Sequence, residues 1–340
     1  MTYAVTLIPG DGVGPEVAAA AVKVIEATGV PIAWDSHAAG SSALERRGQP
    51  LPDPAIASLQ ATHLALKGPL ETPIGGGFRS ANVALRQIFD LYANVRPVKT
   101  VLPFRSYDDI DLVMIRENTE GLYVGVEHFV RVGDDPRAVA ESAAIVTRRG
   151  CDRIIRFAFE FAVKHQRRKV TLVHKANILK MVSGLFLEVG RDVAKEYEGR
   201  VVFEDRIIDN AAMQLVIRPE QFDVLVTTNM FGDILSDEMA GLVGGLGLAA
   251  SANIGTGAAV FEAVHGTAPD IAGQGLVNPC ALILAGAMML DHIGEADAAR
   301  RVQEAVARAI RDDGVRTKDL GGTASTMAFT EHVVKLLRRN

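Results

Sequence analysis

The order of short apolar runs and longer helical patterns is the feature that most limits how this chain can fold. Apolar, strand-like runs at 3–8, 170–174 and 222–228 are each followed by a helical pattern, at 14–28, 177–196 and 231–243. This alternation is typical of parallel sheets, because parallel neighbours need a crossover connection. The sequence therefore predicts an α/β protein with a large mixed or parallel sheet flanked by helices.

Composition limits the class of protein and its partners. The chain has 340 residues, 48% of them hydrophobic, which is enough for about two domains with substantial cores. Its net charge is −5 and its pI about 5.9. This balance argues against nucleic acid or an anionic membrane as the main partner, so an anionic ligand needs a local cluster of cations.

Cysteine usage and the absence of targeting signals suggest a compartment. Cys151 and Cys280 lie far apart without metal-ligand spacing, so we interpret them as buried small apolar residues in a reducing environment. The N-terminus carries no basic region followed by an apolar stretch, and no run of about 18 apolar residues occurs. We therefore expect a cytoplasmic protein.

The segment IPGDGVGPE near the N-terminus raises the question of a dinucleotide-binding glycine loop. That fingerprint needs glycine or alanine at its third position, where helix and sheet pack closely, but Pro15 stands there. We interpret Gly10, Gly12 and Gly14 as a tight turn instead. Pro15 then begins the following helix, and Asp35 is a solvated loop acid rather than a ribose ligand.

The segment RSANVALRQIFDLYANVRP, residues 79–97, combines a helical pattern with anion-binding groups. Its apolar residues recur at helical spacing, namely Leu85, Ile88, Phe89 and Tyr92. This spacing predicts a helix with one buried stripe, and Ser80 is placed to cap its first turn. A helix start behind the glycine-rich stretch 67–80 offers free N–H groups to a carboxylate or phosphate.

Arginines extend this anion-binding pattern. Asn82 and Arg86 are four residues apart and share a helix face, Arg96 stands in an extended segment, and Arg116 ends an apolar run. Guanidinium groups bind carboxylates with two hydrogen bonds at once. Any one of these arginines alone is more often an ordinary surface or salt-bridged residue. Together they predict a site for a di- or tricarboxylate.

A second set of residues predicts acid and proton-transfer chemistry. In NMFGDILSDEMAGLVGG, Asp233 and Asp237 lie on the helix face opposite the apolar residues. They form either a solvated face or a site for Mg²⁺ or Mn²⁺, which Asp209 could complete.

Two further residues carry the proton-transfer interpretation. Lys175 follows a strand at the sheet edge where such proteins bind ligands, and a neighbouring cation would favour its participation in proton transfer. Tyr123 is a plausible acid partner, although a structural tyrosine is the ordinary interpretation.

Taken together, the chain resembles the isocitrate/isopropylmalate family of metal-dependent β-decarboxylating dehydrogenases. The matching segments run in order over nearly the whole chain: IPGDGVGPE, KGPLETP, RSANVALRQ, DLYANVRP, RENTEGLY, HKANI, NMFGDILSD, GGLGLAASANIG and HGTAPDIAG. The resemblance implies the two-domain fold of isopropylmalate dehydrogenase, not a Rossmann fold.

Within this family, the substrate depends on the helix that begins near Ser80. Ser80 and Asn82 with Arg86 are similar to isocitrate dehydrogenases, whereas isopropylmalate enzymes carry leucines there. The resemblance thus implies NAD-dependent oxidative decarboxylation of isocitrate to 2-oxoglutarate and CO₂ with Mg²⁺ or Mn²⁺, a step of the tricarboxylic acid cycle. Homoisocitrate dehydrogenase is the first alternative, and 3-isopropylmalate dehydrogenase a weaker one.

The resemblance also assigns roles to residues. The substrate's carboxylates would be bound by Arg86, Arg96 and Arg116, and its γ-carboxylate end by Ser80 and Asn82. The cation would be held by Asp209, Asp233 and Asp237, and protons moved by Lys175 and Tyr123. Lys175 and Asp209 would act in the partner subunit's site, which implies a homodimer with shared active sites.

The cofactor loop of this family corresponds to a later segment than the opening glycine turn. The cofactor contacts implied by the resemblance are Thr72, Glu262, His265, Gly266, Thr267, Ala268, Asp270, Ile271 and Asn278. NADP-dependent relatives carry Lys-Tyr where this chain has Asp270 and Ile271. Since a carboxylate accepts from a free ribose hydroxyl and repels a 2′-phosphate, NAD is favoured. Gly322 takes the place of an arginine found in some NADP-dependent relatives.

The family fold is discontinuous in sequence. Residues 1–99 and 252–340 would form a large cofactor-binding domain, and residues 100–251 a small dimerisation and substrate domain with an arm near 128–147. A non-catalytic subunit of a hetero-oligomer is another alternative. It would have lost some of the proton-transfer and metal-binding residues, and none of them is missing here.

Overall fold

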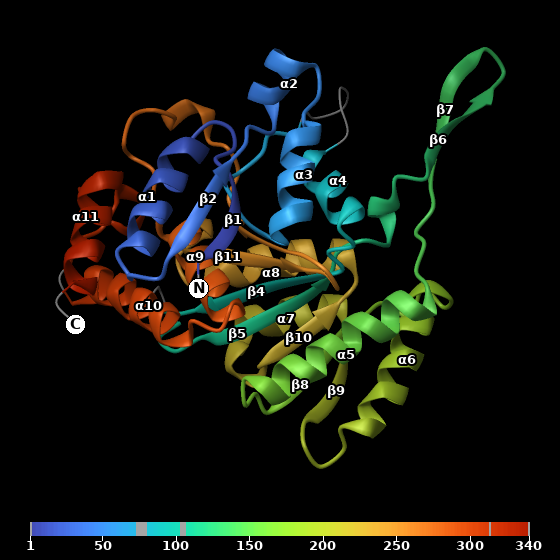
Figure 1. The fold of residues 1–340 in the computed structure, drawn as a ribbon. Helices are drawn as coiled ribbons and strands as arrows, with labels where there is room; N and C mark the ends of the chain where they lie inside the picture. Colours follow the sequence, from blue (N-terminus) through green and yellow to red (C-terminus); the bar gives the residue numbers. More distant parts are fainter. Residues whose placement is uncertain (1, 73–79, 103–106, 313, 339–340) are drawn as a thin grey trace. The chain divides into compact units, whose positions relative to one another are not determined.

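The computed structural model describes residues 2–72, 80–102, 107–312 and 314–338 (Figure 1). The chain divides into two compact units. Unit 1 comprises Met1–Leu91, Arg96–Asp109 and Ala240–Asn340, and unit 2 comprises Tyr92–Val95 and Ile110–Met239. The predicted small domain reached residue 251, whereas unit 2 ends at Met239; β11 (Ala250–Ile254) pairs with β12 (Ala259–Ala263) within unit 1.

Unit 1 is built from both ends of the chain. Its other strands are β1 (Tyr3–Ile8), β2 (Ile32–Ser36), β3 (Leu64–Lys67) and most of β4 (Ala93–Lys99). Its helices are α1 (Gly14–Glu26), α2 (Ser41–Arg47), α3 (Asp53–Thr62), α4 (Ala81–Ile88), α9 (Cys280–His292), α10 (Ala296–Arg311) and α11 (Thr326–Leu337). Helix α9 is apolar on nearly all sides and buried, as expected for a central core helix. It packs closely on α1, since a Cβ at Gly286 would lie 2.2 Å from Ile25 Cδ1.

Unit 2 contains the middle of the chain. Its strands are β5 (Asp111–Glu117), β6 (Glu127–Val132), β7 (Asp135–Ser142), β8 (Lys169–His174), β9 (Val202–Ile207) and β10 (Val224–Thr227). Its helices are α5 (Arg148–Lys164), α6 (Val182–Glu196), α7 (Ile208–Ile217) and most of α8 (Asn229–Leu242). Strand β10 is entirely buried between β5 and β8, and β9 forms the half-exposed edge.

Ten strands form one hydrogen-bonded sheet in the order β2-β1-β3-β12-β11-β4-β5-β10-β8-β9. The pairs of β1 with β2 and β3, of β12 with β3, of β10 with β5 and β8, and of β8 with β9 are parallel, whereas β11 and β12 are antiparallel. The predicted α/β class with a large, mostly parallel sheet is therefore confirmed. No helix in the described ranges is long and apolar enough to cross a lipid bilayer.

A hairpin of β6 and β7 projects away from α5 and α6 (Figure 1). Nearly all of its side chains are exposed on both faces. It occupies the region where the sequence predicts an arm. Its apolar residues include Phe129 and Val132, which are more than half exposed, so the hairpin has no core of its own.

Several local expectations need correction. The helix predicted within 79–97, whose apolar stripe extended to Tyr92, ends at Ile88, because Asp90 adopts a left-handed φ of 45° and β4 begins at Ala93. Ile88 is exposed rather than buried. Tyr92 lies beyond the helix, and Arg153 Cζ lies over its ring, 4.6 Å from the ring centroid. Asp35 is not a loop acid: it lies in β2, where its carboxylate accepts a 2.6 Å hydrogen bond from Ser58.

The two cysteines behave as the sequence suggests. Both are buried and neither forms a disulfide. Burial raises the pKa of Cys151 to about 12 and also raises that of Cys280. Both thiols are therefore protonated and unreactive at neutral pH.

Candidate active site

Arg116 is the buried centre of a polar cluster in unit 2. The side chain lies on β5 and is 0% exposed. Its Nε and Nη2 donate to Asn229 Oδ1 at 3.1 and 2.7 Å, and its Nη1 pairs with Asp233. The Tyr123 hydroxyl donates to the other oxygen of Asp233 at 2.7 Å. A predicted substrate arginine, proton donor and metal ligand therefore share one hydrogen-bonded cluster.

Asn229 belongs to this cluster but was not predicted from the sequence. Its amide oxygen accepts from Arg116, and its Nδ2 donates to the Glu120 carbonyl at 3.2 Å. An asparagine at the start of a helix is ordinarily interpreted as a cap. The sequence pattern around Asn229 therefore does not indicate that its side chain accepts hydrogen bonds from a buried arginine. Gly232 completes the packing, because a Cβ there would lie 2.6 Å from Arg116 Cγ.

Lys175 and Asp209 form an ion pair elsewhere in unit 2. Lys175 directly follows β8, at the predicted carboxyl end of a strand. Asp209 lies in the first turn of α7, and the hydrogen bond from Lys175 lowers the pKa of its carboxyl. The two residues assigned to a partner's site are thus paired with each other.

His174 fixes the main chain beside Lys175. Its Nδ1 accepts a 3.0 Å hydrogen bond from the Ala176 N–H, so the ring proton resides on Nε2. Nε2 lies 3.1 Å from Asp205 Oδ1 and donates to it. This arrangement defines the ring orientation and holds the turn that carries Lys175.

The predicted metal ligands are divided between two places. Asp233 and Asp237 lie one helical turn apart on α8, on the face opposite the buried Leu235 and Met239, as predicted. Within a single copy, the described residues include no group of three or more histidine, cysteine or acidic side chains arranged around a common point. Carboxylate oxygens nevertheless suit Mg²⁺ and Mn²⁺, so Asp233 and Asp237 fit part of a ligand set.

The other substrate residues lie in unit 1. Ser80 occupies the N-cap position of α4, but its side chain makes no cap hydrogen bond and accepts instead from the Thr72 hydroxyl at 3.1 Å. The buried Asn82 Oδ1 has no hydrogen-bond partner in the described part of the chain, which suits contact with a ligand. Arg96 is buried on β4. Residues 73–79 of the predicted glycine-rich stretch lie outside the described ranges.

Glu262 connects Arg86 to a second buried cation. The Glu262 carboxylate lies 2.7 Å from Lys67 Nζ and 3.6 Å from Arg86 Nη2, and it accepts from Asn253 at 2.7 Å. Burial alone would raise its pKa, but Lys67 and Arg86 hold the pKa at about 2. Lys67 is 2% exposed. Its role was missed because its partner lies far away in the sequence, although a lysine ending an apolar strand was a usable signal.

The predicted cofactor loop presents one free buried acceptor. His265 Nδ1 lies 3.0 Å from the Gly266 carbonyl and so carries the ring proton. Its Nε2 is buried without a hydrogen-bond partner in the ranges that the structure describes. Burial lowers the pKa of this imidazole, so it is neutral at pH 7 and Nε2 can accept from a ligand. Ala268 adopts a left-handed φ of 37°, which is unusual for a residue with a side chain.

Asn278 directly precedes Pro279, the N-cap residue of α9. Its Oδ1 accepts from Cys280 N at 3.0 Å, and its Nδ2 donates to Asp319 at 2.9 Å. A contact of Asn278 with the cofactor stays a prediction. Asp270 and Ile271 lie in a single 3₁₀ turn with Asp270 exposed.

Gly322 leaves no room for the arginine of NADP-dependent relatives. A Cβ at Gly322 would lie 2.0 Å from the Arg316 carbonyl oxygen. An arginine could be placed here only if the main chain moved.

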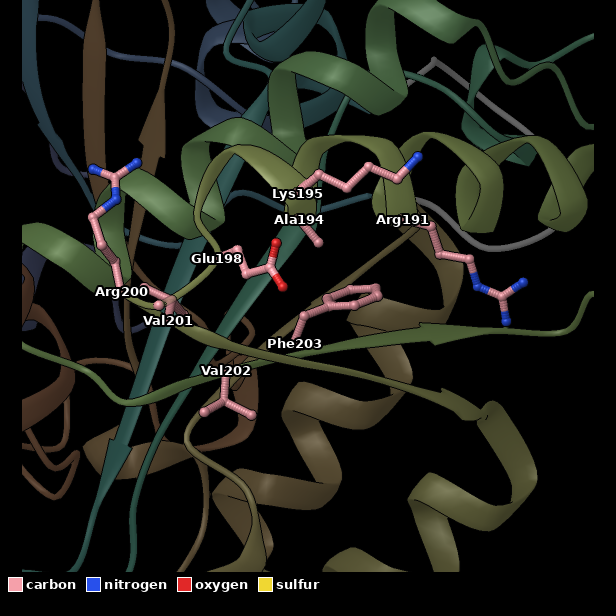
Figure 2. A pocket seen from close by; sticks show the side chains of 9 residues that line it. Arg191, Ala194, Lys195, Glu198, Arg200, Val201, Val202 and Phe203 are labelled. Atoms are coloured by element: carbon pink, nitrogen blue, oxygen red, sulfur yellow. The ribbon is translucent and has the colours of Figure 1, made fainter.

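A cavity of about 450 Å³ lies in unit 2 (Figure 2). It is formed at the end of α6 and the start of β9, and its lining includes Arg191, Lys195, Glu198 and Phe203. In Figure 2 the charged ends of the Arg191, Lys195 and Arg200 side chains are not turned toward the Glu198 carboxylate. No predicted site residue lines this cavity.

The fold and these clusters together define an α/β protein of two units, each with its own cluster of cationic and acidic side chains. The chain matches the isocitrate/isopropylmalate dehydrogenase family over residues 4–335 and belongs to it. It is therefore a dehydrogenase, and the predicted family and fold are confirmed.

Two relatives and one solved structure are similar to nearly the whole of this chain. The isocitrate/homoisocitrate dehydrogenase of Thermus thermophilus is 49% identical over 340 residues, covering 99% of each chain. The mitochondrial catalytic subunit 5 of NAD isocitrate dehydrogenase from Arabidopsis thaliana is 47% identical, over 96% of this chain and 87% of its own. A crystal structure of isocitrate dehydrogenase from Methylococcus capsulatus is 57% identical and superposes with a TM-score of 0.96 over 99% of both chains.

Proposed function

We propose that the protein catalyses the NAD-dependent oxidative decarboxylation of isocitrate to 2-oxoglutarate and CO₂ with Mg²⁺ or Mn²⁺. The observation that carries this proposal is the cluster of Arg116, Tyr123 and Asp233. It brings a carboxylate-binding cation, a phenol that can donate a proton and a hard oxygen ligand into hydrogen-bonding contact. A β-decarboxylating dehydrogenase needs these three groups beside one substrate.

Different residues of the chain would bind the substrate and transfer protons. Arg86, Arg96 and Arg116 bind the substrate's carboxylates, and Lys175 assists removal of the hydroxyl proton. Tyr123 supplies a proton to the carbon that has lost CO₂. When bound, NAD would supply the acceptor for the hydride, and a divalent cation would supply the positive charge that stabilises the oxygen anion formed on loss of CO₂.

Two features support NAD as the cofactor. The neutral His265 Nε2 is a buried acceptor without a protein partner among the described residues, as expected for a group that meets a ligand. The exposed Asp270 carboxylate can accept from a ribose hydroxyl and would repel a 2′-phosphate. The Arabidopsis relative is named as an NAD enzyme.

A homodimer with shared sites is part of the proposal. Residues close to Lys175 and Asp209 expose large apolar side chains: Ile178, Leu179, Met181, Met213, Val216 and Ile217. Met181 is 83% exposed. Such surfaces are typical of subunit interfaces, and covering them would carry Lys175 and Asp209 towards a partner. Asp209 of one chain would then join Asp233 and Asp237 of the partner subunit around the cation.

A substrate panel tests the proposal. NAD reduction is measured with the purified single chain and with isocitrate, homoisocitrate and 3-isopropylmalate, each with and without EDTA. Isocitrate should give the highest kcat/KM, and EDTA should abolish the reaction. An inactive single chain would support a non-catalytic subunit instead.

Homoisocitrate is the second candidate substrate. The Thermus relative, which matches 99% of this chain, is named for both substrates. Higher kcat/KM with homoisocitrate than with isocitrate would transfer the assignment to that reaction.

A further inference from the structure

The opening loop of residues 9–14 packs against both segments assigned to the cofactor. A Cβ at Gly10 would lie 2.2 Å from the Pro69 carbonyl oxygen, and one at Gly12 would lie 2.0 Å from that of Thr267. The Asp11 N–H donates to Pro69 at 2.8 Å, and the Val13 N–H donates to Thr267 at 2.9 Å. The glycines are therefore needed because main chain meets main chain at these points.

Asp11 holds this junction with its side chain. The carboxylate is buried, with 5% of the residue exposed. Its Oδ2 accepts from the N–H groups of Ser41 at 3.0 Å and Glu71 at 2.9 Å, and its Oδ1 accepts from Ser42 at 3.3 Å. Gly40 lies so close that a Cβ there would be 1.9 Å from Oδ2. The Asp11 side chain is thus enclosed, and both of its carboxylate oxygens accept hydrogen bonds from main-chain N–H groups.

We infer that Asp11 is a positioning residue for the cofactor site. It fixes the main chain at Glu71, next to Thr72, while Gly12 and Val13 fix the loop that begins at His265. The inference rests on the proposed function, because Thr72 and the His265 loop matter for NAD only if they contact it. The opening loop then serves nucleotide binding indirectly, by setting the places of two other loops.

The contacts predict which kinetic parameter depends on Asp11. The carboxylate touches no residue assigned to proton transfer or to the cation, and those residues belong to unit 2. Loosening Glu71 displaces Thr72 and so weakens NAD binding. The steps after binding use Lys175 and Tyr123, whose surroundings do not change. A loss of NAD affinity with a retained kcat is therefore expected.

Asp11→Asn is the decisive variant. Asparagine keeps the size of the side chain but turns one accepting atom into a donor, and all three side-chain contacts described for Asp11 come from donors. In either orientation of the amide the Glu71 N–H loses its charged acceptor, because it then faces either a neutral oxygen or a nitrogen that cannot accept. We expect the Kd for NAD, measured by titration without substrate, to rise about tenfold, which is the effect of one lost charged hydrogen bond.

Asp35→Asn is the matched control. Asp35 also lies in unit 1 and accepts a side-chain hydrogen bond, from Ser58, but it is bonded to neither cofactor segment. Its Kd for NAD should stay within about twofold of the wild type. Equal Kd values in the Asp11 and Asp35 variants would overturn the inference, as would a large loss of kcat at unchanged Kd.

A second variant protects the test against misfolding. Glu71→Pro removes the main-chain N–H group that donates to Asp11 Oδ2, and it leaves Asp11 itself unchanged. It should reproduce the loss of NAD affinity, and an unchanged Kd in a folded Glu71→Pro chain would refute the inference. The titrations contain no substrate, so they decide the role of Asp11 whether or not isocitrate is the substrate.

Discussion

Replacing Arg116 with lysine tests whether the Arg116 cluster of unit 2 binds substrate through the geometry of a guanidinium group. Arg116→Lys keeps the charge and most of the stem but removes the planar fork. A lysine ammonium can reach one of the two partners, Asp233 or Asn229, but it cannot make both Asn229 hydrogen bonds and the ion pair. The loss is therefore one of hydrogen-bond geometry, with no change in net charge.

The size of the effect follows from burial. Asn229 Oδ1 receives two N–H groups from Arg116 and belongs to a residue that is 0% exposed. Leaving this acceptor unpaired costs about 1–3 kcal/mol, and the weakened contact to Asp233 adds to that. We expect the free energy of unfolding to fall by about 3 kcal/mol. Substrate binding by the fork should be lost as well, lowering kcat/KM for isocitrate about 100-fold, or about 2.7 kcal/mol.

Urea unfolding and steady-state kinetics measure the two effects. Unfolding is followed at one protein concentration, because the apparent stability of a dimer depends on concentration. Arg148→Lys is the control: Arg148 lies 2.7 Å from Glu188, but the side chains are 60% and 59% exposed, so its effect should be within about 1 kcal/mol. Equal stability losses in both variants would refute the role of burial. An isocitrate kcat/KM within about threefold of the wild type would refute substrate binding by Arg116.

Three further predictions concern the cofactor and the proton-transfer residues. Asp270→Lys with Ile271→Tyr should shift the ratio of kcat/KM for NAD and NADP towards NADP, and an unchanged ratio would contradict the carboxylate argument. Lys175→Ala should lower kcat by about 10²-fold or more with little change in the Kd for NAD, whereas a near-normal rate would exclude a catalytic role. The affinity for NAD should be constant near pH 7 and fall in acid, because the lowered pKa of His265 keeps Nε2 an acceptor until the pH drops below that pKa. His265→Asn should remove this acid limb, and its persistence would assign the limb to another group.

Regular periodicity made much of the fold predictable. The pattern of 231–243 placed Leu235 and Met239 inside and Asp237 outside, and α8 has this arrangement. The pattern of 79–97 failed at its end, because helical spacing continues in the sequence after the backbone has left the helix. The left-handed φ of Asp90 stops α4, and no preference of aspartate for that conformation is strong enough to show it beforehand.

The sequence could propose residues of the candidate site by their type, but not the partners that these residues contact. Arg116 and Asp233 could be named from short segments, whereas Asn229, 113 positions from Arg116 in the chain, supplies the acceptor that orients it. Lys67 likewise meets Glu262 only through the pairing of β3 with β12. Sequence patterns report local periodicity, and such contacts depend on which strands become neighbours.

The opening loop shows that a glycine motif rejected as a nucleotide-binding loop can have a structural reason of its own. Its glycines suggested a loop that cradles a nucleotide, and Pro15 argued against that role. The structure gives the glycines a different reason, because Gly10 and Gly12 face carbonyl oxygens of the chain itself. Close backbone approach requires glycine whether the approaching group is a phosphate or another loop. Glycine spacing alone therefore cannot distinguish a ligand from the protein's own main chain, and only the neighbouring buried Asp11, with its three N–H donors, identifies the second case here.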